Sequence, residues 1–256
     1  AADPVDQARL HLAAARAATD AGRDEQARTH AEQAAVLFDG LGDPLRAAQS
    51  AAAHARALLD LGDNAGAVAV AEARWRTLQG ATGAEQALVA LAGSIVPAYG
   101  RMLQWDKQHE YAEHLLVLAE GLGDMGALAG AYVSLGMRYT VIGAPYTGAV
   151  CYSTAAGIAR DHNLPSQLAK TLNNLASSMN TRDPDTARAA AVEGLDVARR
   201  AGLTTVVDWA AGTRLSGLWL AGAHAEVAEL LAELGDVRVV REERGAEMPA
   251  MQRQGG

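Results

Sequence analysis

Two short strings in this 256-residue chain contain residue types that hold cofactors or metals. The first is the segment 121–126, which has glycines at its first, third and sixth positions, as in the fingerprint of a dinucleotide-binding turn. That fingerprint follows a β-strand and opens a helix. Here the residues before position 121 have helical periodicity, so we expect an interhelical turn and no cofactor.

The second string, residues 109–114, has a histidine at each end and glutamates between them, much like the helix motif of zinc proteases. His109 and His114 are five residues apart, which separates them by about 140° around a helix, too far to share a metal ion. The chain shows no paired carboxylates and no nucleophile motif. We therefore expect no metal site, no catalytic residues and no enzymatic activity.

The composition of the chain indicates which class of partner and which cellular compartment to expect. The formal net charge is -8, whereas a protein that binds a nucleic-acid backbone usually shows a basic face, so we expect no direct contact with nucleic acid. The single cysteine, Cys151, cannot form an internal disulfide, which favours a cytoplasmic location. No apolar run is long enough to span a bilayer. The chain does not begin with methionine, which suggests a module cut from a longer protein.

Helices must position any binding residues, and helical segments recur about every forty residues. Each repeat has two helices joined by a tight turn, and the second helices align on small residues: Ala27, Ala67, Gln108, Ala149, Ala187 and Val227. Four residues further on, on the same helix face, lie Ala31, Ala71, Ala112, Ser153, Ala191 and Leu231. A fixed period of this length is typical of stacked helical hairpins. The sequence predicts an all-α fold, a right-handed α-solenoid of about six hairpins.

Proline, glycine and aspartate signals set the hairpin boundaries. An aspartate followed by proline, as at positions 3–4 and 43–44, caps and opens a helix. Pro97 lies inside an expected helix and predicts a local kink. We expect a repeat domain over residues 1–236 and a C-terminal tail or linker over residues 237–256. The expected hairpins are 3–41, 43–80, 84–122, 124–163, 165–201 and 203–235.

The fourth repeat combines small residues with aromatic side chains near its turn, at Leu135-Gly136, Tyr139, Tyr146, Ala149 and Ala156. This pattern resembles the tetratricopeptide (TPR) consensus. The segment 172–176, LNNLA, resembles the opening of its kinesin-light-chain-like branch. The long period is similar to that of arrays in large bacterial signal-transducing ATPases, including the LuxR-type and antibiotic regulators of actinobacteria. The alanine- and arginine-rich composition agrees with an actinobacterial origin.

The resemblance implies that the first helix of each hairpin lines a concave groove. Aligning the turns predicts nine groove residues: Arg9, Arg16, Gln49, Arg56, Met137, Lys170, Asn173, Asn174 and Ser177. Arginine offers forked donors to carboxylate or phosphate. In the resembled branch, asparagines at this place contact peptide main chain, a role that Asn174 and Asn173 can take over. The alternative is that the arginines are solvated or pair with carboxylates such as Asp20 and Asp60.

These observations favour a non-catalytic binding module of a multidomain bacterial regulator of transcription. Its partner would be an acidic or carboxylate-bearing peptide, protein segment or small effector that shifts the equilibrium of attached domains. An alternative is an assembly role, in which the terminal hairpin, with Trp219 and Leu220, and the tail drive self-association into a homodimer.

Overall fold

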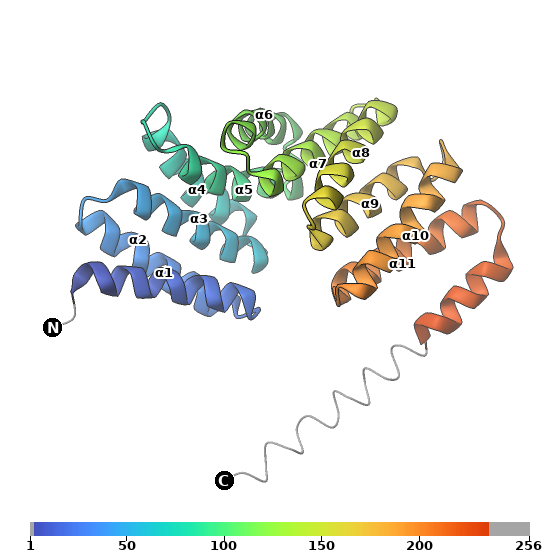
Figure 1. The fold of residues 1–256 in the computed structure, drawn as a ribbon, viewed down its shortest axis with the longest axis horizontal. Helices are drawn as coiled ribbons and strands as arrows, with labels where there is room; N and C mark the ends of the chain where they lie inside the picture. Colours follow the sequence, from blue (N-terminus) through green and yellow to red (C-terminus); the bar gives the residue numbers. More distant parts are fainter. Residues whose placement is uncertain (1–2, 236–256) are drawn as a thin grey trace, which may run out of the picture. The chain divides into compact units, whose positions relative to one another are not determined.

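Segments rich in alanine, the best helix former, alternate with short turns in a computed structural model that describes residues 3–235. Within that range every regular element is an α-helix (Figure 1). The helices are α1 (Pro4–Asp20), α2 (Asp24–Gly40), α3 (Pro44–Asp60), α4 (Asn64–Leu78), α5 (Glu85–Arg101), α6 (Trp105–Leu122), α7 (Met125–Val141), α8 (Pro145–Asp161), α9 (Pro165–Met179), α10 (Pro184–Arg200) and α11 (Thr204–Leu220), followed by a helix over 224–235.

Local sequence signals place the helix starts where they were predicted. Asp3 and Asp43 each accept a hydrogen bond at 3.0 Å from a backbone N–H in the first turn of the helix that follows, and proline occupies the first helical position. The segment 121–126 forms the end of α6, a turn and the start of α7, which confirms the interhelical turn. α5 continues through Pro97, so the kink remains a prediction.

Most interhelical turns contain a glycine with a positive φ angle, and in two others a different residue takes that conformation. Leu103, between α5 and α6, has a φ of 58°, and Asn163, between α8 and α9, has a φ of 53°. This left-handed backbone conformation suits glycine because other residues bring Cβ too close to the carbonyl oxygen. Leu103 is 68% exposed, so no burial of its side chain offsets that strain.

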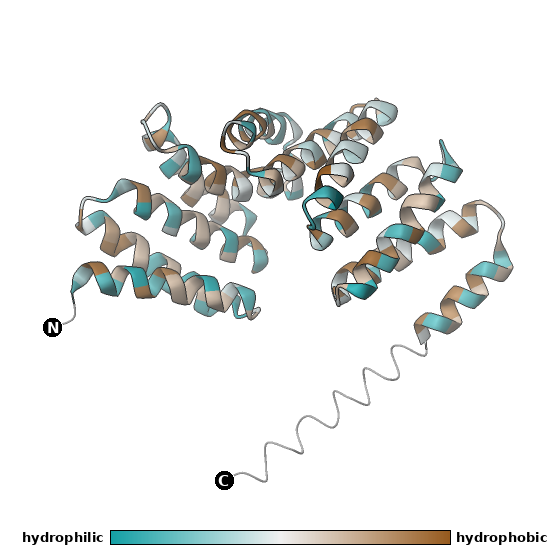
Figure 2. Ribbon diagram, viewed as in Figure 1, coloured by the Kyte–Doolittle hydropathy of each residue, from teal (hydrophilic) through white to brown (hydrophobic). Residues whose placement is uncertain are grey.

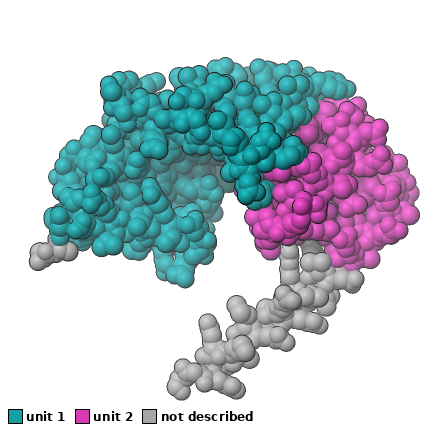
Figure 3. Space-filling view, viewed as in Figure 1, with its two compact units in different colours: residues 1–167 teal, residues 168–256 magenta. Residues whose placement is uncertain are grey.

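The chain divides into two compact units, residues 1–167 and residues 168–256 (Figure 3). In unit 1, each of α1 to α7 packs against the next helix, and the first helices of successive hairpins also pack on one another, α1 on α3, α3 on α5 and α5 on α7. Unit 2 contains most of α9, together with α10, which packs against α11. The extent of the repeat domain stays a prediction, and the predicted tail over 237–256 lies outside the described residues.

Small residues dominate the core, as the aligned sets predicted. Ala27, Ala31, Ala67 and Ala71 are at most 1% exposed. Glycine allows the backbones of α7 and α8 to approach closely, since a Cβ added to Gly148 would lie 2.8 Å from the carbonyl oxygen of Gly136. Figure 2 shows the resulting mixture of apolar and polar residues along each helix. None of the described helices combines the length and apolar character needed to cross a membrane.

Two members of the second aligned set, Ser153 and Leu231, are exposed and do not share the burial of Ala31 and Ala71. In α8 the adjacent Tyr152 takes the buried position, and its ring packs against Gly136 of α7, where a Cβ would lie 2.8 Å from a ring carbon. A large aromatic residue beside a glycine has replaced the contact between small residues that the alignment assumed.

Candidate functional site

Five of the predicted groove residues lie in unit 1. Arg9 and Arg16 are exposed on α1, and Arg56 is exposed on α3. Gln49 of α3 and Met137 of α7 are half-buried. Three of these five predicted residues therefore present guanidinium groups to solvent.

The three arginines differ in their partners. Arg56 donates from Nε to an oxygen of Asp60 at 2.8 Å, and Arg9 lies 3.6 Å from Asp6, both within one helix. In the described part of the chain, no carboxylate forms an ion pair with Arg16. Exposed pairs of this kind contribute about 0.2–1 kcal/mol. A carboxylate on a binding partner can therefore replace Asp60 at little cost, and Arg16 offers its full set of donors.

The other four predicted residues lie on α9. Three of them follow Lys170 at spacings of three, four and seven residues: Asn173, Asn174 and Ser177. At these spacings the four side chains share one helix face. Lys170 and Ser177 are exposed and the two asparagines are half-buried. The Asn173 Oδ1 atom is buried without a hydrogen-bond partner among the described residues. This face offers a cation, amide donors and acceptors, and a hydroxyl, which together suit an extended peptide or a small polar ligand.

The structure also contains a polar cluster that sequence reasoning missed, between α4, α5 and α6. Glu72 is 9% exposed, and its Oε1 accepts hydrogen bonds from the hydroxyls of Tyr99 and Tyr111, the latter at 3.1 Å. Arg76 donates to the other oxygen of Glu72 at 2.5 Å. The ring of Trp75 meets that of Tyr111 edge to face, with centroids 5.3 Å apart. The cluster fixes three helices through one carboxylate.

The electrostatics of this cluster keep both tyrosines protonated. Burial raises the pKa of Tyr111 to about 12, and the Glu72 carboxylate adds to the shift because it repels a phenolate and accepts the phenol's hydrogen bond. Burial and the same carboxylate raise the pKa of Tyr99 further. These tyrosines therefore act as neutral hydrogen-bond donors that stabilise a buried carboxylate.

A pocket in unit 2 was also missed. It has a volume of about 210 Å³ and lies between α10, α11 and the start of the helix over 224–235. Its floor includes the buried residues Ala187, Ala191 and Leu218. The available signal was the pair of alanines, four residues apart on α10, facing Gly217 of α11. Small side chains on two adjacent helices leave space between them.

The histidines of the string 109–114 have separate roles. The Nε2 atom of His109 lies 3.5 Å from Oε1 of Glu113. The ring of His114 instead packs beside that of Trp75, with ring centroids 5.7 Å apart. Across residues 3–235, no three side chains among histidine, cysteine, aspartate and glutamate are grouped so that they could hold a metal ion.

Comparison with known proteins identifies the fold. No family model and no curated protein matches the chain. Aspartyl phosphate phosphatase F from Bacillus subtilis is similar in structure, with a TM-score of 0.71 and 13% identity over 93% of this chain and 61% of its own. A Rap protein complexed with Competence and Sporulation Factor has a TM-score of 0.70 and 14% identity over 99% of this chain and 71% of its own.

A third similar structure is a signal transduction ATPase with a tetratricopeptide repeat sensor from Pyrococcus horikoshii. Its TM-score is 0.63 and its identity 14%, over 93% of this chain and 38% of its own, so this chain spans well under half of that protein. At these identities the likeness concerns the fold. The chain is an all-α array of TPR-like helical repeats, which confirms the predicted fold class.

Proposed function

We propose that this chain is a non-catalytic binding module of a multidomain bacterial regulator, with a role in signal transduction and transcription regulation. The observation that carries the proposal is the set of exposed polar side chains on the first helices: Arg9, Arg16 and Arg56 on α1 and α3 of unit 1, and the Lys170–Ser177 face on α9 of unit 2. The chain is acidic overall, and Arg16 on α1 forms no ion pair within residues 3–235. This set of side chains favours an acidic or carboxylate-bearing peptide, protein segment or small effector.

Two of the structural neighbours support this proposal. One is a Rap protein complexed with Competence and Sporulation Factor, and another carries a tetratricopeptide repeat sensor in a signal transduction ATPase. The same architecture thus holds a partner in one protein and serves as a sensor in another. A LuxR-type or antibiotic-regulatory ATPase of an actinobacterium is the context that we propose for this chain.

The proposed mechanism is linkage. A ligand that contacts the first helices of several hairpins stabilises one curvature of the array, and domains attached to the array respond to that curvature. Such a ligand shifts the equilibrium only by its difference in affinity for the two states. The module needs no chemistry of its own for this.

The test is capture of partners from host lysate by the immobilised chain. We expect a partner that the wild type retains and that is lost with Arg16→Glu/Arg56→Glu, and with Asn174→Ala on α9. The matched control is Arg200→Glu on α10, a second helix, because Arg200 pairs with Asp196 four residues away at 2.7 Å, just as Arg56 pairs with Asp60. Circular dichroism checks that each variant folds.

Retention should also fall as salt rises from 0.05 to about 0.5 M, since guanidinium–carboxylate contacts are screened. Equal recovery of every protein by the wild type and by both groove variants would contradict the proposal.

A second candidate function is self-association, and one observation favours it. Trp219 and Leu231 are 65% and 53% exposed and line a shallow apolar groove with Leu215, Leu220 and Val227. A second copy of this chain would cover the groove, because within residues 3–235 no further hairpin follows this one to pack against it. Light scattering after gel filtration should then show a dimer that Trp219→Glu disrupts and Trp209→Glu does not, Trp209 being similarly exposed on α11 but outside the groove. A monomeric wild type at high concentration would contradict self-association.

A further inference from the structure

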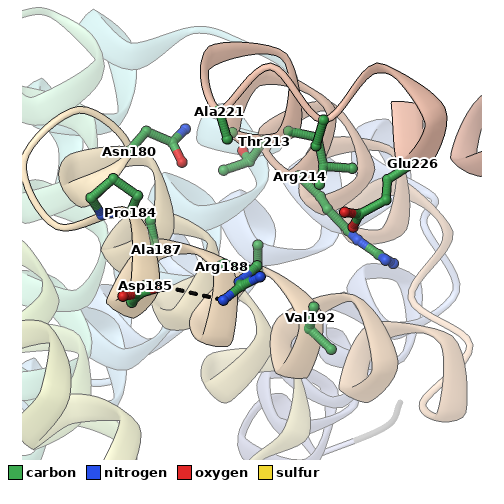
Figure 4. Close-up of a pocket in the computed structure, with 14 residues that line it drawn as sticks. Asn180, Pro184, Asp185, Ala187, Arg188, Val192, Thr213, Arg214, Ala221 and Glu226 are labelled. Atoms are coloured by element: carbon green, nitrogen blue, oxygen red, sulfur yellow. Dashed lines mark hydrogen bonds and ion pairs between the residues drawn. The ribbon is translucent and has the colours of Figure 1, made fainter. Parts of the chain in front are cut away.

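The pocket of unit 2 combines an apolar floor with a charged rim (Figure 4). Its volume of about 210 Å³ holds about seven water-sized groups, which is close to one large amino-acid side chain. Ala187 and Ala191 of α10 and Leu218 of α11 are at most 6% exposed and form the apolar part. A ligand that fills this space buries an apolar group of about that size.

Four charged side chains line the rim, and only two of them pair with each other. Arg188 donates to Asp185 at 3.1 Å, and both lie on α10. Arg214 of α11 and Glu226 line the same pocket, yet neither has an ion-pair or hydrogen-bond partner among the described residues. The pocket therefore presents one unpaired cation and one unpaired anion to any molecule inside it.

A polar amide lies at the opposite end of the view from these two charges (Figure 4). Asn180 follows α9, and its Oδ1 approaches α11 so closely that a Cβ added to Gly217 would lie 2.9 Å from it. Glycine at position 217 thus admits the amide into the pocket wall. Asn180 supplies one acceptor and two donors near the apolar floor.

We propose that this pocket binds a free α-amino acid with a large apolar side chain, of the size of leucine or phenylalanine. The carboxylate of the ligand contacts the guanidinium of Arg214, its ammonium contacts the carboxylate of Glu226, and its side chain covers Ala187 and Ala191. A simple carboxylic acid would leave Glu226 facing a second negative charge. A simple amine would leave Arg214 facing a second positive charge, so a zwitterion satisfies both groups.

The pocket is separate from the proposed groove residues. The pocket lies between α10 and α11, whereas the groove residues of unit 2 lie on α9. Binding of an amino acid here would make the module responsive to nutrient supply, whatever partner its first helices hold.

Calorimetric titration and thermal denaturation with four probes test the chemistry of the ligand. Leucine should bind and raise the melting temperature. N-acetyl-leucine lacks the ammonium, leucinamide lacks the carboxylate and glycine lacks the apolar side chain, so each should bind about tenfold or more weakly. Leucinamide binding as tightly as leucine would overturn the zwitterion assignment, and absence of leucine binding at tens of millimolar would overturn the proposal.

Variants test the location. Arg214→Gln should weaken leucine binding about tenfold and change leucinamide binding little, because leucinamide has no carboxylate. Glu226→Gln should also weaken leucine binding about tenfold and change N-acetyl-leucine binding little, because N-acetyl-leucine has no ammonium group. Ala191→Leu fills the pocket and should abolish leucine binding. This variant tests the location of the site even if a variant of Arg214 or Glu226 folds poorly. The control is Arg200→Gln, an exposed arginine of α10 that does not line the pocket. Undiminished leucine binding by Arg214→Gln and Ala191→Leu would place the site elsewhere.

Discussion

Glu72 is a carboxylate in a core made largely of alanine, and its burial depends on its partners. The two tyrosine hydroxyls and Arg76 satisfy both of its oxygens. Burying a charge is costly unless it is paired and hydrogen-bonded. Arg76 is the only one of these partners in contact with bulk water to a large extent, with 71% of its side chain exposed, so the tyrosines provide most of the buried support.

This arrangement predicts unequal effects for the two members of the ion pair. Glu72→Ala should lower the free energy of unfolding by about 2–4 kcal/mol, because it leaves two buried hydroxyls without their acceptor. Arg76→Ala should lower it by less than about 1 kcal/mol, because an exposed cation contributes little. Urea denaturation followed by circular dichroism measures both values. Equal losses would show that the ion pair, and not the tyrosines, stabilises Glu72.

The same cluster predicts a loss of stability in alkaline solution. Burial raises the pKa of Tyr111 from 10.0 to about 12 in the folded chain, and that of Tyr99 is also raised. Below pH 10 the tyrosines are protonated in both the folded and the unfolded chain, and their contribution to stability is complete. As the pH rises from about 10 to 12, the tyrosines of the unfolded chain ionise first, so this contribution to stability is lost. Thermal denaturation between pH 9 and pH 12 should therefore show a falling melting temperature.

A variant separates the contribution of the cluster from that of Tyr152, whose pKa burial also raises to about 12. Tyr99→Phe/Tyr111→Phe should reduce the slope of melting temperature against pH in this range and leave a residual slope due to Tyr152. An unchanged slope in the double variant would remove the cluster as a cause.

At the scale of elements, the turn between α5 and α6 is the place where sequence and backbone disagree most clearly. Leu103 has the left-handed conformation that glycine provides at the corresponding turn between α7 and α8, where Gly143 has a φ of 86°. The strain of a left-handed non-glycine residue is about 1–2 kcal/mol, and the extra entropy of glycine in the unfolded chain offsets about half of it. Leu103→Gly should raise the free energy of unfolding by about 0.5–1 kcal/mol.

The reciprocal change provides the control for this prediction. Gly143→Leu should lower the free energy of unfolding by about 0.5–1 kcal/mol, because it introduces the strain that Leu103→Gly removes, offset in part by the lost entropy of glycine in the unfolded chain. Thermal denaturation should show a higher melting temperature than the wild type for Leu103→Gly and a lower one for Gly143→Leu. A lower melting temperature for Leu103→Gly would mean that the exposed leucine makes a stabilising contact.

The helices were predictable because their signals are local. Asp43 and Pro44 open α3 through a cap and a fixed φ angle that involve only adjacent residues. The cluster around Glu72 was not predictable, because it joins residues 27 and 39 positions apart, and such contacts depend on the packing register of three helices. The pocket required the approach of Asn180 to Gly217, another contact between helices. Local patterns thus predicted the elements and the fold, and left these sites to tertiary packing.

For the predicted groove residues, too, local patterns predicted position and not partners. The alignment of turns placed Lys170, Asn174 and Ser177 on one face of α9, because residues three, four and seven apart must share a face. It gave no information on their partners, and the ion pair between Arg56 and Asp60 is the alternative that the sequence had left open.

At the scale of the whole molecule, an array of hairpins should unfold locally, since each hairpin contacts only its neighbours. Phe38 of α2 joins the first hairpin to the second through a small cluster that includes Leu12 of α1 and Ala47 of α3. It is 1% exposed, and the guanidinium of Arg46 lies 5.8 Å from the centre of its ring. Phe38→Ala should therefore cost about 3–5 kcal/mol at this junction.

The location of that loss is the sharper prediction. Hydrogen exchange measured by mass spectrometry should show reduced protection in α1, α2 and α3 and unchanged protection in α10 and α11, because the stability of an array is a sum of repeat and nearest-neighbour contributions. Val36→Ala, which removes an exposed side chain of the same helix, should change neither region. A uniform loss of protection from α1 to α11 in Phe38→Ala would show instead that the chain unfolds as one cooperative body, so that a ligand on one hairpin could act on every other through global stability alone.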